Sequence, residues 1–301
     1  MDCEPSPRPG RSMILRCQPR AHGSRNPRRE GGERNRLGYN PTMDGDDWNP
    51  ELYLKYGGER TRPAEDLIAR IHLKEPRTII DIGCGPGNST QALAARFPNA
   101  HLTGLDNSPT MIARARADFP QHEWIQADAG SFESERRFDV VFSNAAIQWI
   151  SDHARLIERL AVLARPGGVL AVQTPMFSDM PIRMAIARTA AHPRWGQAMR
   201  DCNAVFTFHP HGFYYDRLSG LASAIDMWET SYVHVMPSLA TLVEWMRSTG
   251  LRPYLDCLPE ATDKQAFEEE LLVQLAQDYQ VRSDGKVLFP FKRLFFIAHL
   301  R

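Results

Sequence analysis

The chain has 301 residues, and its charge is balanced, with 36 Lys and Arg against 36 Asp and Glu. A nucleic-acid partner usually requires a basic patch, so this balance argues against one. No apolar run approaches the length of a membrane span, and the five cysteines show neither a metal-ligand spacing nor a disulfide framework. We therefore expect a cytoplasmic protein with no membrane segment, no metal site and one sizeable core.

The first part of the chain differs in composition from the rest. Residues 1–45 are rich in Arg, Pro, Gly and Ser and show almost no apolar periodicity. Such a segment cannot bury enough apolar area to offset the entropy lost on ordering. Its acidic residues and prolines also argue against a mitochondrial presequence. We predict a disordered extension at residues 1–45 and one catalytic domain at residues 46–301.

A short β-branched apolar run at residues 78–82 predicts a buried parallel strand. It contains an acid, Asp81, and leads into glycines at positions 83, 85 and 87, which allow the backbone to approach a ligand closely. The polar residues 88–90 are suited to capping a helix over residues 91–97. A strand, a glycine-rich turn and a helix together predict a nucleoside-cofactor site.

The spacing of the glycines separates two classes of cofactor site. A dinucleotide fingerprint requires glycine at position 88, where this chain has Asn88, and this disfavours a nicotinamide oxidoreductase. Gly-x-Gly-x-Gly with an acid two residues upstream instead resembles the first motif of the class I S-adenosylmethionine-dependent methyltransferases. The resemblance implies S-adenosylmethionine as the cofactor. The loop residues that it places around this cofactor are Asp81, Gly83, Cys84, Gly85, Gly87 and Asn88.

Two further predicted strands end in acids. Asp106 closes the strand His101–Asp106 at the position of a ribose-binding acid, because a cis-diol offers two donors to one carboxylate. Met111, on the helix that Ser108 caps, lies either against adenine or in the core. Asp128 follows a third strand and either accepts from the adenine amino group or is a solvated turn acid. Their neighbours in the predicted cofactor site are Asn107 and Ala129.

The strand pattern continues through the chain. Residues 138–145 form a fourth strand with Asn144 at its polar tip, the last predicted cofactor residue, and residues 169–174 form a fifth strand after a Pro-Gly-Gly stop. Residues 227–236 and 294–300 look like the last two strands of the methyltransferase sheet. We predict an α/β fold with a doubly wound, seven-stranded, mostly parallel Rossmann-like sheet and an antiparallel last strand. Residues 46–72 and about 237–285 are expected to form a helical substrate cap.

Segments outside the cofactor motif carry a narrower resemblance. They are Trp-Asn-Pro-Glu-Leu-Tyr-Leu at 48–54, Glu-Arg-Thr-Arg-Pro-Ala at 59–64, Gln-Trp at 148–149 and Ser-Thr-Gly-Leu-Arg-Pro at 248–253. From residue 48 onward the chain resembles the trans-aconitate 2-methyltransferase family. This implies methyl-ester formation on a carboxylate of trans-aconitate or a related small polycarboxylic acid. Two alternatives stay open, namely methylation of a different small metabolite and a non-catalytic assembly protein that binds S-adenosylmethionine.

A polycarboxylate substrate requires cations, and the planar fork of arginine binds a carboxylate through two hydrogen bonds. We expect no catalytic acid or base, because a carboxylate is already ionised at neutral pH and positioning supplies most of the acceleration. A monomer or weak homodimer is expected. The predicted substrate residues are Arg60, Arg62, Arg252, Tyr53, Tyr56, Gln148 and Trp149.

Overall fold

A computed structural model describes residues 57–202, 206–247 and 249–301. The chain divides into two units, residues 1–42 and 43–301, and all described residues belong to the second. The extension predicted at residues 1–45 therefore lies outside the described residues.

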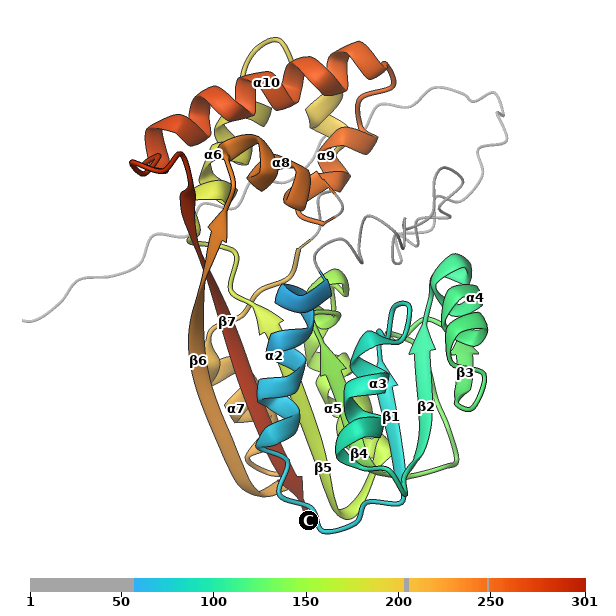
Figure 1. Cartoon of the computed structure of the whole chain (residues 1–301). Helices are drawn as coiled ribbons and strands as arrows, with labels where there is room; N and C mark the ends of the chain where they lie inside the picture. Colours follow the sequence, from blue (N-terminus) through green and yellow to red (C-terminus); the bar gives the residue numbers. More distant parts are fainter. Residues whose placement is uncertain (1–56, 203–205, 248) are drawn as a thin grey trace, which may run out of the picture. The chain divides into compact units, whose positions relative to one another are not determined.

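Seven strands form one sheet in the order β3-β2-β1-β4-β5-β7-β6 (Figure 1). Its parallel part consists of β1 (Thr78–Ile82), β2 (His101–Asp106), β3 (Glu123–Gln126), β4 (Phe138–Asn144) and β5 (Ala164–Pro175). Strand β7 (Val287–Leu300) is inserted antiparallel between β5 and β6 (Ala222–Met236). The predicted fold class, including the antiparallel last strand, is confirmed.

Three strands begin earlier than the sequence indicated. The Pro-Gly-Gly segment was expected to end the preceding helix and to stand before the fifth strand. Strand β5 instead starts at Ala164 and includes this segment, in which Gly167 has a left-handed φ of 75°. Strand β6 is longer than expected because residues 222–226 also pair with the end of β7. Strand β7 is longer because its first residues pair with β6 beyond the rest of the sheet, as far as Val287 opposite Met236. This two-stranded extension connects the sheet to a group of helices.

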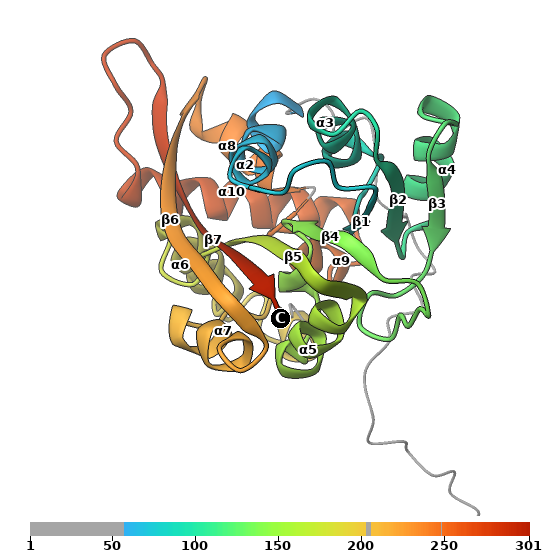
Figure 2. The same ribbon diagram turned by 90° about the horizontal axis from the view of Figure 1, so that it is seen from below.

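Helices cover both faces of the sheet, as Figure 2 shows in a view along the strands. Helices α2 (Gly57–Ala69) and α3 (Asn88–Arg96) lie on one face, and α5 (His153–Leu163) and α7 (His211–Leu218) lie on the other. Side chains alternate between the two faces along each strand. In β4, for example, Val140 and Phe142 pack towards α2 and α3, while Val141 packs towards α5.

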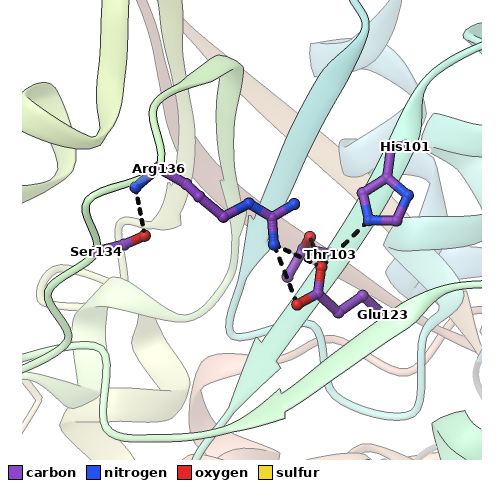
Figure 3. Close-up of polar contacts among 5 residues, drawn as sticks. All are labelled: His101, Thr103, Glu123, Ser134 and Arg136. Atoms are coloured by element: carbon purple, nitrogen blue, oxygen red, sulfur yellow. Dashed lines mark hydrogen bonds and ion pairs between the residues drawn. The ribbon is translucent and has the colours of Figure 1, made fainter.

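At the β3 side of the sheet, Glu123 joins three segments of the surface. It accepts hydrogen bonds from His101 and Thr103 of β2 and from Arg136 in the loop before β4, the last at 2.8 Å (Figure 3). Ser134 in turn accepts from the Arg136 backbone. Arg136 lowers the pKa of Glu123. Because Arg136 is exposed and Glu123 only half-buried, their ion pair contributes little stability and mainly sets the position of the loop.

The helical cap has its own core. Helices α6 (Pro181–Ala190), α8 (Leu239–Arg247), α9 (Arg252–Asp256) and α10 (Ala261–Asp278) gather at one end of the sheet (Figure 1). They pack around buried residues that include Trp245 and Phe267, together with Phe289 of β7. The sequence indicated helices in residues 237–285 but gave no signal for α6.

The amino-terminal part of the predicted cap, residues 46–72, does not join this group of helices in its described residues. Of residues 46–72, those before Gly57 lie outside the described residues. The remainder contains α2, whose Leu67 packs on the sheet beside Ile79 and Val140, as does Ile71 after the end of the helix. The described part of this segment therefore covers a face of the sheet.

Within the described ranges, no helix is both long and apolar enough to cross a membrane. Nor do those residues include a group of three or more His, Cys, Asp or Glu side chains placed to hold a metal ion.

Candidate functional site

The glycine turn after β1 is tied to the end of β2 by backbone hydrogen bonds. The amides of Gly83 and Cys84 both donate to the carbonyl oxygen of Leu105, at 2.7 and 3.0 Å. The amide of Gly85 donates to Oδ2 of Asp106 at 2.9 Å. These bonds fix the turn at the carboxyl ends of β1 and β2, where α/β sheets bind ligands.

Two glycines of this turn have different surroundings. Both have left-handed backbones, with φ of 55° at Gly85 and 97° at Gly87. A Cβ atom added to Gly85 would meet nothing within 4 Å, whereas at Gly87 it would lie 2.8 Å from the Trp124 ring and 2.9 Å from Phe119. Gly85 therefore borders open space, while Gly87 allows tight packing.

Asp81 is buried at the end of β1, with 1% of its surface exposed. Its Oδ2 accepts hydrogen bonds from Ser89 Oγ at 2.6 Å and Thr90 Oγ1 at 2.7 Å. Burial raises its pKa to about 6, and these two hydrogen bonds act in the opposite direction. Its Oδ1 is buried and has no hydrogen-bond partner among the described residues.

The expectation that residues 88–90 cap the following helix is wrong. Helix α3 already begins at Asn88, after Gly87 at the N-cap position, and no side chain caps it. Ser89 and Thr90 lie in its first turn and bind Asp81 instead. The buried carboxylate is the stronger acceptor, because hydrogen bonds to an ionised group exceed neutral ones in strength.

Asp106 holds two neighbouring segments. Besides the Gly85 amide on Oδ2, its Oδ1 accepts from the Ser108 amide at 2.9 Å. Ser108 caps helix α4 (Pro109–Asp118) as predicted, accepting from the Met111 amide at 3.2 Å. Met111 itself is 3% exposed, so its side chain belongs to the buried interior.

The remaining cofactor candidates vary in burial. Cys84 is buried, and burial raises the pKa of its thiol well above the usual value. Asn107 is exposed, and Asn88 is half-buried beside a cavity of about 380 Å³ between α2, α3 and the end of α4. A role for these residues in cofactor binding stays a prediction.

Asp128 lies in an exposed turn after β3. Its Oδ1 accepts from the Gly130 amide at 3.0 Å and its Oδ2 from Ser131 Oγ at 3.1 Å. The neighbouring Ala129 is half-buried. These bonds show that the carboxylate shapes its own turn, and both alternatives left open by the sequence are compatible with that.

The end of β4 lies against the glycine turn. A Cβ atom added to Gly83 would fall 2.2 Å from the Cβ of Ala146, so the two segments are in contact. Asn144 ends β4, and its Oδ1 is buried with no hydrogen-bond partner in the described part of the chain. Ala145 follows with a φ of 52°, a strained value for a residue with a side chain.

A cavity of about 100 Å³, partly open to solvent, begins at this point. It lies between the carboxyl ends of β4 and β5, helix α8 and strand β7. Its wall is mainly aromatic, and Gln148 and Trp149, which the sequence predicted for the substrate, are both part of it. The aromatic lining residues are Trp149, Phe177, Phe206, Phe208, Trp245 and Phe291. The polar side chains of the lining are those of Gln148, Thr249 and Arg293.

Gln148 is fixed by the chain around it. It is 5% exposed, and its Nε2 donates to the carbonyl oxygen of Ala145 at 2.6 Å. The backbone amide of Thr207 donates to the Gln148 carbonyl at 2.9 Å. The short 3-10 helix Ile147–Trp149 is thus held between the end of β4 and the segment that carries Phe206 and Phe208.

Arg293 is the residue that sequence reasoning missed. It is 5% exposed, and its Nη1 donates to Oε1 of Gln173 at 3.2 Å. Its guanidinium carbon lies 4.6 Å from the centre of the Phe291 ring. One signal was present in the sequence. Side chains two residues apart in a strand point to the same face, and Phe291 and Phe295, two residues before and after Arg293 in β7, are both buried. Lys292, on the other face, is exposed.

The predicted arginines lie elsewhere. Arg62 on α2 is exposed, and its guanidinium carbon is 5.1 Å from the Tyr232 ring centre. Arg252 begins α9, with its Nε 3.4 Å from Oδ2 of Asp256. Neither is among the described residues that line the cavity. Tyr53, Tyr56 and the side chain of Arg60 lie outside the described part of the chain.

Comparison with known proteins identifies the family. Residues 79–168 match a family model described as a methyltransferase domain. Trans-aconitate 2-methyltransferases of Variovorax paradoxus and Methylobacterium radiotolerans are each 43% identical over 255 residues, which is 84% of this chain and 98% of the relative. The chain belongs to the trans-aconitate 2-methyltransferase family. A member from Yersinia pestis is 41% identical over 254 residues, 84% of this chain and 98% of the relative.

Membership in the trans-aconitate 2-methyltransferase family makes the chain a methyltransferase, which confirms the resemblance seen in its sequence. Solved structures support the fold. The YcgJ protein of Bacillus subtilis superposes with a TM-score of 0.57 at 16% identity, covering 80% of this chain and 99% of that one. Phosphoethanolamine N-methyltransferase 2 of Haemonchus contortus, in complex with S-adenosyl-L-methionine, gives 0.52 at 16% identity, covering 83% and 56%.

Proposed function

We propose that the chain transfers a methyl group from S-adenosylmethionine to a carboxylate oxygen of trans-aconitate, or of a closely related small polycarboxylic acid, and so forms a methyl ester. The names of its relatives support this substrate class. The observation that carries the proposal is Arg293, a buried cation on the wall of an aromatic cavity that starts at the end of β4, the strand end that contacts the glycine turn.

The residues at the strand ends fit S-adenosylmethionine. Asp81 and Asn144 each present a buried oxygen with no partner among the described residues, and such an atom suits a ligand that carries N–H donors. Gly85 leaves open space beside the backbone. Asp106 accepts one backbone amide on each oxygen, and since a carboxylate oxygen has two lone pairs, it can also accept from a ribose hydroxyl. When bound, this cofactor supplies an activated methyl group.

The chain's own contribution is to hold the acid. A carboxylate is ionised at neutral pH and attacks without a proton acceptor. Arg293 binds a carboxylate of the substrate through its planar fork, while the Gln173 amide and the Phe291 ring keep the guanidinium in one orientation. The aromatic wall limits contact with water, which strengthens the attraction between the two charges. Orientation of this kind supplies up to about 7–11 kcal/mol in favourable reactions.

Product identification tests the proposal. The full-length protein is incubated with S-adenosylmethionine and, separately, trans-aconitate, cis-aconitate, citrate and an alkylmalate, and the products are analysed by mass spectrometry. We expect one added methyl group on trans-aconitate, released as methanol by mild alkali because it is an ester. A methyl product that resists alkali, or methylation of none of these acids, would contradict the proposal. Calorimetric binding of S-adenosylmethionine, measured in parallel, tests the cofactor separately from the acid.

A further inference from the structure

Two cysteine thiols meet at one carbonyl oxygen in the helical cap. Sγ of Cys202 lies 3.2 Å and Sγ of Cys257 lies 3.1 Å from the carbonyl oxygen of Pro253. Cys202 follows the short 3-10 helix Ala198–Asp201, and Cys257 follows α9. Because both sulfur atoms contact the same oxygen, their separation cannot exceed the sum of these two distances. Both side chains are half-buried, so a small oxidant can reach them.

Tyr254 of α9, next to Pro253, binds a cation. Nη1 of Arg183 donates to its hydroxyl at 2.6 Å. Burial raises the pKa of Tyr254, and Arg183 acts in the opposite direction. Cysteine reacts with oxidants as the thiolate.

We propose that Cys202 and Cys257 are a redox pair that closes into an intramolecular disulfide when a peroxide oxidises one of the thiols. The first thiolate attacks the peroxide, whose O–O bond breaks, and sulfenic acid and water form once a proton is taken up. The second thiol then attacks the sulfenic sulfur. The S–S bond forms, the S–O bond breaks, and the second thiol's proton leaves with the hydroxide as water. In total the two thiols lose two electrons and two protons, and one peroxide is reduced to two waters.

The disulfide would act on the cavity that holds the substrate. Cys202 precedes the segment of Phe206 and Phe208, and α9 follows Thr249 and Gly250, so each thiol is joined to a segment that lines the cavity. Formation of the bond requires both thiols to leave the Pro253 oxygen and rotate towards each other, since the two sulfurs in a disulfide are about 2.05 Å apart. We expect this rotation to draw the two lining segments together and to raise the Michaelis constant for the acid. This last consequence rests on the proposed function, whereas the disulfide itself does not.

The test uses the full-length chain with Cys3→Ser and Cys17→Ser, which leaves Cys84, Cys202 and Cys257. The protein is treated with hydrogen peroxide, its free thiols are counted after denaturation, and its tryptic peptides are analysed by mass spectrometry. We expect the loss of two thiols, a linked peptide that contains Cys202 and Cys257, and full reversal by dithiothreitol. Cys84 should stay reduced because it is buried at 3% exposure.

Single variants identify the pair. Adding Cys257→Ser should abolish the linked peptide and leave Cys202 as a sulfenic acid that dimedone traps. Adding Cys202→Ser should also abolish the linked peptide and leave Cys257 as the trapped sulfenic acid. A linked peptide that contains Cys84, a disulfide between two chains on a non-reducing gel, or unchanged thiols after peroxide would each overturn the proposal. An oxidised protein with the linked peptide but an unchanged Michaelis constant would overturn the link to the cavity. These peptide readouts need no methyl acceptor, so they stand apart from the test of the proposed function.

Discussion

The two halves of the candidate site are built in different ways. At the ends of β1 and β2, the polar groups belong to residues near one another in sequence and bind one another, as Asp81 binds Ser89 and Thr90. In the cavity, the polar side chains of Gln148, Thr249 and Arg293 come from segments far apart in the chain. A local motif can encode the first half, whereas only the tertiary fold assembles the second.

The charges of the two halves are also opposite. Asp81 and Asp106 stand at the strand ends beside the glycine turn, Asp128 follows β3, and Arg293 stands on the cavity wall. An arrangement with acids on one side and a cation on the other suits a cationic methyl donor and an anionic acceptor. A substitution at the strand ends should therefore weaken binding of the methyl donor and spare the acid, and a substitution in the cavity should do the reverse.

The largest effect is expected at Arg293. Arg293→Met keeps most of the side-chain volume and removes the charge, so a bound carboxylate loses its partner in a largely aromatic site. Losses of this kind cost about 2–5 kcal/mol, so kcat/KM for the acid should fall at least about thirtyfold. Arg293→Lys keeps the charge without the planar fork and should fall in between. Steady-state kinetics with varied acid measures both changes.

Affinity for S-adenosylmethionine, measured by calorimetry, should stay close to wild type in both Arg293 variants. Equal losses for cofactor and acid would identify Arg293 as a structural residue. Wild-type kinetics in Arg293→Met would remove it from the substrate site.

The second prediction concerns two glycines of one turn. Gly87→Ala adds a Cβ atom 2.8 Å from Trp124 at a φ of 97°, and overpacking with a left-handed backbone should cost about 2–4 kcal/mol of stability. Gly85→Ala points its Cβ atom into open space and should cost only about 1–2 kcal/mol. Because that space belongs to the proposed cofactor site, Gly85→Ala should nevertheless weaken binding of S-adenosylmethionine at least about tenfold. Thermal unfolding and calorimetry separate the two effects, and equal melting temperatures would contradict the packing difference.

The third prediction is the pH dependence of Asp81. Its pKa is raised from 3.8 to about 6 in the folded protein. Between about pH 4 and 6 the folded protein therefore keeps a proton on Asp81 that the unfolded chain has lost. The stability that Asp81 contributes is present below about pH 4 and is lost as the pH rises through about 6. Asp81→Asn does not ionise and keeps one oxygen for Ser89 and Thr90, so at pH 7.5 it should be more stable than wild type by about 2–3 kcal/mol.

The stability difference between Asp81→Asn and wild type should shrink as the pH is lowered from 7.5 to 4 in urea unfolding. A constant difference across this range would contradict a titrating Asp81.

The sequence predicted the fold because each strand carries its own local signal. The apolar β-branched runs, the glycine turn and the Ser108 cap are short-range features, and all were found where the pattern indicated. The first part of β7 was missed because it pairs only with β6, which is far away in sequence. Ser89 and Thr90 were misread because their preference for a buried carboxylate over a helix cap depends on the position of Asp81.

The substrate half was predicted less well, and for a physical reason. Gln148 and Trp149, which the family resemblance indicated for the substrate, lie beside the β4 end and line the cavity. Arg293 is adjacent to them only because β7 is inserted next to β5, pairing Pro175 with Arg293. No local spacing encodes that contact. The inward position of Arg293 between Phe291 and Phe295 was the available clue.

The smallest effect is expected at Arg252, the arginine favoured by the sequence. Its side chain is 14% exposed and its Nε lies 3.4 Å from Asp256, a partner that is itself 58% exposed. A partly exposed ion pair of this kind contributes less than about 1 kcal/mol. Since Arg252 is not among the described lining residues, Arg252→Ala should change kcat/KM for the acid less than about fivefold and leave S-adenosylmethionine affinity unaltered. A loss comparable to that of Arg293→Met would place both arginines on the substrate, which requires α9 to move towards the cavity when the acid binds. Measuring the two variants side by side therefore decides whether the cavity is already formed or closes around its ligand.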